Sequence, residues 1–394
     1  MDSLIPVRRQ RLRLNLNNGI LCFVLILVST PVFAQSSEDS TIPPHGIQAF
    51  LDQTHLGGYG EMSYENPGYY NDVPRLDLKR IVLYVAHSFN DKWAFKSEFE
   101  VEHVRIERGT GGEVEWEQAY LDYHGSNAIG WRGGEMVLPI GITNQTHEPP
   151  TFYSVERPLF DQQVIPTTWY EIGTGFYGTI TEGIEYQLYV TEGLKAEGLA
   201  MDGTDGAKQE ASARENGNDT IAGSDATHPA ISTKLDFLPI AGLRIGASAY
   251  YQAKAFDSLP TGGNGSFLMV MFDARFEHGP LRLRGEGGFF TVGQDGANYY
   301  GTPSKAVGGY GEVAYNILPF FSSSAQEALP FVRYESYAFT GPAPATTAIH
   351  HNHLIAGVAY KPLDNLIFKA DYRFSKVDGL PDYHQLSLGG GFVF

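Results

Sequence analysis

The stretch KWAFKSEFEVEHV at residues 92–104 alternates apolar and polar side chains with a period of two. In an extended strand its apolar members fall on one face: Trp93, Phe95, Phe99 and Val101. Its charged members fall on the other face: Lys96, Glu98, Glu100 and Glu102. Three glutamates in a dry core would each need a costly desolvation, whereas a wet surface tolerates them. The stretch therefore predicts a β-strand with one apolar face and one solvated face.

The same alternation recurs along the rest of the chain. We count sixteen such segments, near residues 54–64, 79–90, 92–104, 113–124, 128–138, 175–182, 184–191, 231–238, 241–254, 267–277, 281–291, 306–318, 329–338, 353–361, 365–375 and 383–394. Several have the roughly 9–11 residues that a tilted strand needs to cross a bilayer. The pattern predicts an all-β, transmembrane antiparallel barrel over residues 54–394, preceded by a lead segment at 35–53.

The connections between these segments alternate in length. Tight turns such as Asn90-Asp91 and Glu182-Gly183 separate longer loops, and only 319–328 is long where a short turn is expected. Bacterial barrels have short periplasmic turns and long outer loops. A sheet in hydrocarbon must close on itself, and closing about sixteen strands leaves an aqueous channel. These features predict a pore with both ends of the chain on the periplasmic side.

The two ends of the chain carry export signals. Residues 1–34 combine four arginines with a short apolar run at 20–28 and small side chains before Gln35, which predicts a cleaved signal peptide. The last strand ends on the aromatic Phe394, as does the signal read by the outer-membrane assembly machinery. We therefore expect the outer membrane of a Gram-negative bacterium as the location, with its lipid and lipopolysaccharide as partners.

Composition excludes several other classes of protein. Removal of residues 1–34 leaves 360 residues with no cysteine, 24 basic and 44 acidic side chains, and a net charge of −20. Disulfides and cysteine-ligated metals are thereby excluded from the mature chain. A chain this acidic is a poor nucleic-acid binder. We predict no cofactor and no metal site.

A set of motifs in the first half of the barrel adds a family resemblance. It consists of GGYGE at 57–61, GEVEWEQAYLDY at 112–123, RGG at 132–134, VLPIG at 137–141, HEPP at 147–150, ERP at 156–158 and IPTTWYE at 165–171, followed by Gly173 and Gly175. In this order the motifs resemble the phosphate-selective porin O and P-like family. The resemblance is dense over residues 55–194 and diffuse beyond them.

The resemblance implies a channel for passive diffusion of small hydrophilic solutes or ions, with anions such as phosphate as one class. It also implies a homotrimer. Anion selectivity in such porins comes from arginine and lysine side chains that line the pore, but the sequence shows no uninterrupted basic ladder. The net charge of −20 does not favour anions, although a global charge does not set the field at a constriction.

The connection 139–174 is the best candidate for a constriction. General porins fold the loop at this position into the barrel, and the prolines of this loop stiffen it. Its candidate pore residues are His147, Glu148, Arg157, Asp161, Trp169 and Glu171. The alternative is a lid that packs on the rim of the barrel.

Charged side chains suggest two walls inside the barrel. The acidic wall is formed by Glu98, Glu100, Glu102, Glu113, Glu115 and Glu117. The basic wall is formed by Arg244, Arg275, Arg282, Arg284, Arg333, Lys369 and Arg373. Opposed walls would create a transverse field that orients dipolar solutes. Simple pairing of neighbouring charges along the wall explains the same residues equally well.

Two further loops hold polar clusters for which the sequence indicates no role. The loop 192–230 carries Asp202, Asp205, Glu210, Glu215, Asp219 and Asp225 among glycines, without the full spacing of a calcium loop. His350, His351 and His353 are expected in an outer loop, where incidental metal affinity is an alternative to a surface without function.

Two rival classes stay open at the level of sequence. An outer-membrane barrel enzyme of the lipase or protease type would need a catalytic histidine. Within residues 55–194, where the family resemblance is dense, His103 and His147 are the histidines near strong acids. No Gly-x-Ser-x-Gly motif is present, so we expect no enzyme. A soluble periplasmic β-rich binding protein would need a packed core in place of a lipid-facing belt.

Overall fold

The computed structural model describes residues 47–68, 73–103, 114–165, 168–199, 226–256, 259, 263–322, 325–341 and 348–394. The chain divides into two compact units, Met1–Gln48 and Ala49–Phe394. The second unit forms a barrel. The predicted signal peptide, Glu113 and most of the loop 192–230 lie outside the described residues.

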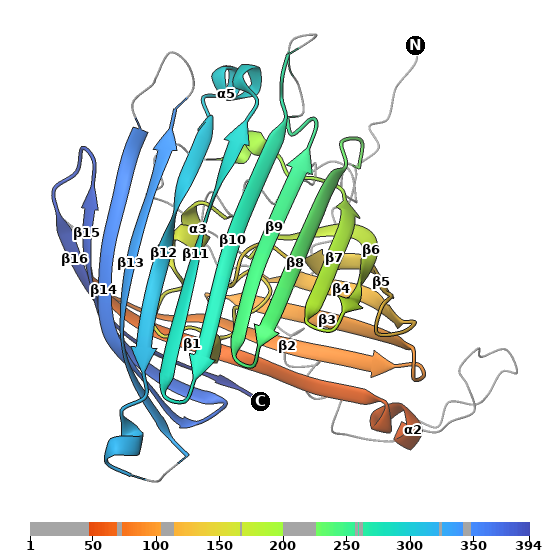
Figure 1. Ribbon diagram of the computed structural model, residues 1–394, viewed down its shortest axis with the longest axis horizontal. Helices are drawn as coiled ribbons and strands as arrows, with labels where there is room; N and C mark the ends of the chain where they lie inside the picture. Colours follow the sequence, from red (N-terminus) through yellow and green to blue (C-terminus); the bar gives the residue numbers. More distant parts are fainter. Residues whose placement is uncertain are drawn as a thin grey trace, which may run out of the picture. The chain divides into compact units, whose positions relative to one another are not determined.

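Sixteen antiparallel strands form one closed sheet in the described part of the chain (Figure 1). Each strand pairs with its neighbours along the sequence, and the first strand pairs with the last. The strands are β1 (Thr54–Pro67), β2 (Arg75–Ser88), β3 (Trp93–Glu102), β4 (Val114–His124), β5 (Gly130–Val137), β6 (Tyr170–Thr181), β7 (Ile184–Thr191), β8 (Ala230–Ile240), β9 (Leu243–Gln252), β10 (Phe267–His278), β11 (Leu281–Val292), β12 (Lys305–Tyr315), β13 (Glu327–Thr340), β14 (Ala348–Leu363), β15 (Leu366–Val377) and β16 (Tyr383–Val393). The predicted fold class and strand number are confirmed.

Short helices lie outside the sheet or inside the barrel. They are α2 (Ile47–Asp52), η2 (Pro149–Thr151), α3 (Leu159–Gln163), η3 (Ala196–Gly198), α5 (Gln294–Tyr300) and η4 (Leu318–Phe320). Among the described residues, no helix is long and apolar enough to cross a membrane. The helix η4 lies in the connection between β12 and β13, which accounts for the unusual length of that turn.

The barrel closes where β1 meets β16. Gly58 and Phe394 exchange two backbone hydrogen bonds of 3.0 and 2.9 Å. A Cβ atom on Gly58 would lie 2.2 Å from the carbonyl oxygen of Val82, so the seam requires glycine at this position. The start of β1 and the end of β16 lie at the same end of the barrel as the short turns, which we call the short-turn end.

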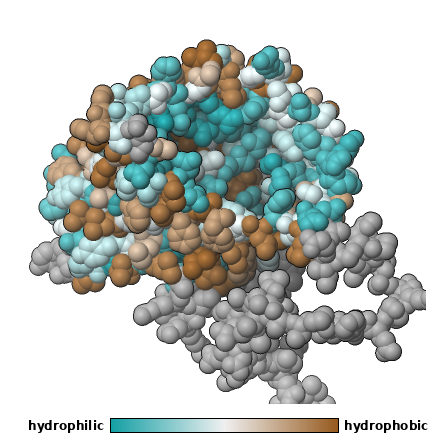
Figure 2. All heavy atoms as spheres, turned by 90° about the horizontal axis from the view of Figure 1, so that it is seen from below, coloured by the Kyte–Doolittle hydropathy of each residue, from teal (hydrophilic) through white to brown (hydrophobic). Residues whose placement is uncertain are grey.

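Side chains alternate between an apolar outer face and a mostly polar inner face. On β13, Val332 and Tyr334 are 46% and 53% exposed, whereas Phe331 and Arg333, which alternate with them, are 3% and 2% exposed. Hydrophilic residues gather around the hollow of the barrel, and hydrophobic residues gather on its outer side (Figure 2). This is the arrangement expected of a sheet that faces lipid outside and water or protein inside.

Some strand boundaries differ from those expected. β6 begins at Tyr170 rather than near 175, so Glu171 belongs to a strand and not to the preceding loop. β14 begins at Ala348, so the prediction that His350, His351 and His353 lie in an outer loop was wrong. His351 and His353 point inward, where both rings contact Tyr337, because residues two apart on a strand share a face.

A β-bulge changes the inward face of β4. Its register against β3 shifts between the pairs Glu98–Gln118 and Phe99–Trp116, which leaves Glu117 without a partner of its own. Glu117 is buried on one side of the bulge, and Tyr120 and Asp122 are buried beyond it. An extra residue moves the following side chains to the opposite face. Simple alternation along the sequence does not reveal such a shift.

The interior of the barrel is more closely packed than an open channel. Its largest cluster of buried apolar residues joins the β5–β6 connection to the inner faces of β9 to β13. Phe160 and Ile165 of the connection pack there with Phe267, Phe290 and Phe339 of the wall. The expectation of a water-filled interior therefore needs correction, because the connection fills part of the space that sixteen strands enclose.

A charge on the outer face should test contact with lipid. Val332→Arg at the middle of β13 should lower the free energy of unfolding by about 2–4 kcal/mol, because a guanidinium at the bilayer midplane must leave water. Val307→Arg, near the start of β12, should cost less than half as much, because this position is closer to the edge of the bilayer. Denaturant unfolding in lipid vesicles measures both, with Val332→Leu as the control. Equal small losses at the two positions would contradict a lipid-facing surface.

Candidate functional site

The connection from Val137 to Tyr170 folds into the barrel and contacts its far wall. It includes η2 and α3, and most of its described residues are buried. We call residues 138–169 the inner loop. The inner loop makes three separate sets of polar contacts with strands that are distant from β5 and β6 in the ring.

The first contact is made by Gly141 and Ile142. The backbone N–H of Gly141 donates to Ser248 Oγ at 3.2 Å, and that of Ile142 donates to Glu286 Oε2 at 2.9 Å. The Lys234 ammonium donates to the Gly141 carbonyl oxygen. Gly141 has a φ of +64°, and a Cβ there would meet the Glu286 carboxylate at 1.9 Å. Glycine is therefore required for this approach to β8, β9 and β11.

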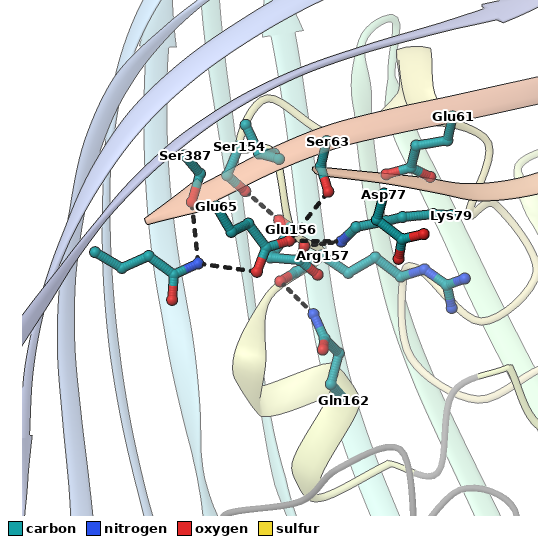
Figure 3. A network of polar contacts seen from close by, with 12 residues as sticks. Glu61, Ser63, Glu65, Asp77, Lys79, Ser154, Glu156, Arg157, Gln162 and Ser387 are labelled. Carbon is teal, nitrogen blue, oxygen red and sulfur yellow. Dashed lines mark hydrogen bonds and ion pairs between the residues drawn. The ribbon is translucent and has the colours of Figure 1, made fainter. Parts of the chain in front are cut away.

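The second contact lies at the tip of the inner loop (Figure 3). The N–H of Val155 donates to Asp371 Oδ2 at 2.6 Å, and Arg333 Nη1 donates to Ser154 Oγ at 2.5 Å. Glu156 forms an ion pair with Lys79 on β2, which also pairs with Glu65 on β1. Charged hydrogen bonds of this kind are roughly twice as strong as neutral ones, so they hold the tip against both sides of the β1–β16 seam.

The third contact is made by α3. The N–H of Phe160 donates to Glu335 Oε2 at 2.8 Å, and the Phe160 ring packs between Tyr310 and Tyr337. The next residue, Asp161, is fully buried and accepts a hydrogen bond from Thr143 Oγ1 at 2.7 Å. Burial raises the pKa of Asp161 to about 7, and the Thr143 hydrogen bond opposes the shift.

His147 lies against the acidic wall. Its side chain is buried, and Nε2 lies 3.6 Å from Glu117 Oε2 and 3.8 Å from Glu98 Oε1. Nδ1 lies 2.9 Å from the Asn144 carbonyl oxygen. Burial alone would lower the pKa of His147, but the Glu117 and Glu98 carboxylates raise it to about 9.

The other candidate pore residues of the inner loop range from half-buried to fully buried. Arg157 is half-buried and donates to Thr168 Oγ1 at 3.0 Å, and Glu148 is also half-buried. Trp169 is fully buried against Tyr250, with ring centroids 4.4 Å apart, and its indole N–H donates to Glu171 Oε1 at 3.0 Å. Trp169 and Glu171 therefore lie in the packed region where the inner loop leads into β6.

The acidic wall is covered by the inner loop. Glu98, Glu100 and Glu117 are 3%, 0% and 1% exposed, whereas Glu102 and Glu115 are partly exposed. We expected open lumen water to solvate these carboxylates, and for the three buried ones this was wrong. Arg80, which the sequence analysis did not single out, lies 3.7 Å from Glu100 and 3.3 Å from Glu61.

Strand register assembles most of the basic wall into one line. Arg244 pairs with Arg275 across β9 and β10, and Arg275 pairs with Arg284 across β10 and β11. The same line continues through Glu312, Arg333, Ile355 and Arg373 on the next four strands. We call its five arginines the arginine row. Arg244 is the second residue of β9 and Arg373 the eighth of β15, so the row climbs from the short-turn end towards the middle of the wall.

Neighbouring acids neutralise part of the basic wall. Arg284 and Arg333 both lie 3.1 Å from Glu312, and Arg244 forms an ion pair with Glu185. Arg282 lies 3.1 Å from Glu327. Lys369 lies over the Phe152 ring at 3.4 Å, and Arg373 donates to Gln385 at 2.6 Å. Within the described residues, Arg275 has no ion pair within 4.0 Å and its Nε donates no hydrogen bond.

Two cavities flank the inner loop. The larger has a volume of about 550 Å³ and lies on the β4 to β9 side, where Arg132 and Arg244 are balanced by Glu185 and Asp236. The smaller has a volume of about 300 Å³ and lies on the β10 to β14 side. Its charged lining is four basic residues and two acidic ones: Arg275, Arg282, Arg284, Lys361, Glu277 and Glu327. Thr146 of the inner loop lines both cavities.

A comparison with protein families identifies the kind of barrel. The model of the family described as phosphate-selective porin O and P matches residues 57–379. The chain belongs to this porin family. Its function is that of a passive channel, as the closed barrel and the family both indicate.

Other proteins are similar to this chain in sequence or in fold. A protein of Aquifex aeolicus (strain VF5) is 33% identical over 337 residues, which cover 80% of this porin and 74% of the relative. The anion-selective porin from Comamonas acidovorans has a TM-score of 0.57 and 12% identity, with 86% of this chain and 99% of that chain covered. OmpF of Salmonella typhi has a TM-score of 0.57 and 12% identity, with 88% and 99% covered. At these identities the two structures show a shared fold.

The buried Asp161 should make the packing of the inner loop depend on pH. Its pKa is raised above the value of about 3.8 in the unfolded chain, so its contribution to stability is complete below pH 4 and is lost as pH rises through about 7. Asp161→Asn should remove this contribution and keep the Thr143 contact. Unfolding free energies in detergent at pH 4.5 and pH 8 measure the effect.

Other groups also titrate in this range, so the difference between wild type and Asp161→Asn is the decisive quantity. The charges that act on Asp161 include those of Glu335, Arg333, Arg157 and Glu286. We expect the Asn variant to gain stability relative to wild type at pH 8 and to lose that advantage at pH 4.5. An advantage that is the same at both values would show that the carboxyl does not titrate in the folded barrel.

Proposed function

We propose that this porin passes small inorganic anions of phosphate size in preference to cations. The observation that carries the proposal is the arginine row, two of whose members, Arg275 and Arg284, line a cavity with four basic and two acidic residues. A net charge of −20 does not oppose this preference, because the local arrangement of charges sets the field in a narrow passage.

Arg275 is the side chain best placed to meet the solute. It stands between Arg244 and Arg284 in the row and lines the smaller cavity. Its neighbours in the row are engaged with Glu185 and Glu312, whereas Arg275 has no such partner among the described residues. Its charge is therefore available to an anion that enters the cavity.

The inner loop is proposed to form the constriction. It crosses the interior, has hydrogen bonds to β8, β9, β11, β13 and β15, and separates the two cavities at Thr146. Such a loop narrows the passage because its packed apolar side cannot be entered by water. The acidic wall of β3 and β4 stands eight strands away from β11 and β12 in the ring of sixteen, so a transverse field across the passage is part of the proposal.

We infer that the chain is exported by a cleaved signal peptide at residues 1–34, assembles through its terminal Phe394 and sits in lipid and lipopolysaccharide. A homotrimer is supported by similar solved structures, one of which is a trimer form of a Vibrio cholerae outer-membrane protein. Porin family membership favours a channel without enzymatic activity over a lipase or protease.

Neutralising Arg275 should reduce anion preference. Arg275→Gln should lower the chloride-to-potassium permeability ratio by about fivefold, since a unit charge about 4 Å from an ion in water contributes about 1 kcal/mol. Reversal potentials in planar bilayers under a salt gradient measure the ratio. Arg275→Lys should keep most of the preference, and Lys305→Gln, an exposed basic residue at the end of β12, should leave it unchanged. If Arg275→Gln leaves the chloride-to-potassium permeability ratio unchanged, the proposed role of Arg275 in anion preference is wrong.

Removing the tip of the inner loop should widen the channel. A variant that lacks residues 150–165 loses the apolar packing and the polar contacts of the tip, so its single-channel conductance should rise severalfold. Removal of residues 379–381 from the β15–β16 connection serves as the matched control and should leave conductance near the wild-type value. Unchanged conductance in the first variant would show that the loop does not limit the passage.

A further inference from the structure

The place where the inner loop meets β3 and β4 differs from its other contacts. Elsewhere the loop touches the wall through direct hydrogen bonds, such as Phe160 N–H to Glu335 at 2.8 Å. Here His147 Nε2 stands 3.6 Å from Glu117 Oε2 and 3.8 Å from Glu98 Oε1, beyond hydrogen-bond distance of both. All three side chains are at least nine-tenths buried.

The three facing atoms have no hydrogen-bond partner among the described residues. The ring orientation of His147 explains which atom faces the carboxylates. Because a carbonyl oxygen can only accept, the contact with Asn144 requires a proton on Nδ1. When the ring is neutral, the lone pair of Nε2 is directed towards Glu98 and Glu117, so that three electron-pair donors converge on one point. When the ring is cationic, Nε2 carries a proton there, which a metal ion would displace.

We propose that Glu98, Glu117 and His147 bind a divalent transition-metal ion of the Zn²⁺ class, which fastens the inner loop to β3 and β4. The ligand atoms lie within 4.8 Å of one another, so an ion at their centre would be roughly 2.0–2.4 Å from each, within a few tenths of an ångström of the roughly 2.0–2.2 Å bonds of Zn²⁺ to nitrogen and oxygen. One imidazole nitrogen and two carboxylates are a ligand set that Zn²⁺ accepts, with water in the fourth position.

The surroundings support a cation at this point. The second nitrogen of His147 donates to a backbone carbonyl, which is the usual support of a metal-bound histidine. Glu100 and Glu115 bring further carboxylate oxygens within 4.8 Å of Glu117. Two permanent cations are near: Arg80 lies 3.7 Å from Glu100, and the charge of Arg157 acts on His147. Buried carboxylates at this density need a cation or shared protons.

An ion can reach the site from the larger cavity. Gln118 and Thr146 line that cavity, and they are the chain neighbours of Glu117 and His147. Gln118 Nε2 also donates to the second oxygen of Glu98 at 2.6 Å, which orients this carboxylate towards His147. The site is therefore buried but lies directly behind the cavity wall.

Metal binding to the untagged, refolded barrel tests the proposal. After treatment with EDTA and dialysis, titration with Zn²⁺ at pH 7.5 should show one ion per chain by calorimetry and by elemental analysis. Co²⁺ should give visible absorption bands of a nitrogen and oxygen site in the same one-to-one ratio. His147→Gln and Glu117→Gln should each weaken binding by more than about 10-fold.

Two controls separate this site from other histidines and acids. His353→Gln removes another buried histidine, whose Nδ1 contacts Ser375 Oγ, and Glu277→Gln removes an exposed carboxylate. Both variants should bind as wild type does. If wild type binds no Zn²⁺ or Co²⁺, the cluster is held by a proton on His147 and the proposal is wrong.

Binding that survives in His147→Gln and Glu117→Gln also overturns the proposal. Should either variant fail to fold, Glu98→Gln gives a third test, and the absence of Co²⁺ bands in wild type would overturn the proposal without any variant. The binding readout does not depend on ion selectivity, so this result and the result for Arg275 can fail separately.

Discussion

Every backbone N–H and C=O group of a sheet in a bilayer must be paired within the protein, because hydrocarbon offers no partner. The structure meets this constraint by joining β1 to β16, with Gly58 and Phe394 at the seam. Closure of sixteen strands then encloses more space than the inward side chains can fill. The inner loop occupies part of that space. It supplies both the apolar packing and the polar contacts that the wall alone lacks.

The inner loop is positioned by charge and by shape together. Its backbone N–H groups donate to the buried carboxylates of Glu286, Glu335 and Asp371, which stand on three different strands. A buried carboxylate without such donors would be costly, and a loop without such acceptors would leave its amides unpaired. Each partner therefore stabilises the other, and the same contacts leave cavities of different charge on the two sides of the loop.

The arrangement of charges inside the barrel is set by the register in which neighbouring strands pair. Arg244, Arg275 and Arg284 are far apart in sequence, yet hydrogen-bonded pairing sets them side by side across three strands. The bulge at Glu117 has a comparable effect on the acidic side, because it brings Tyr120 and Asp122 to the inner face beyond Glu117. A shift of one residue in either place would send these charges to the lipid face.

The sequence by itself determined the class of fold, the strand number, the alternation of short and long connections and the family, because a period of two and turn residues are local signals. It also placed the acidic residues of β3 on the inner face. Only the tertiary structure decided that the arginines form a row, that the inner loop buries Glu98, Glu100 and Glu117, and that His351 and His353 lie on a strand. Those features depend on register, on a bulge and on contacts between distant segments, and none of these leaves a local trace in the chain.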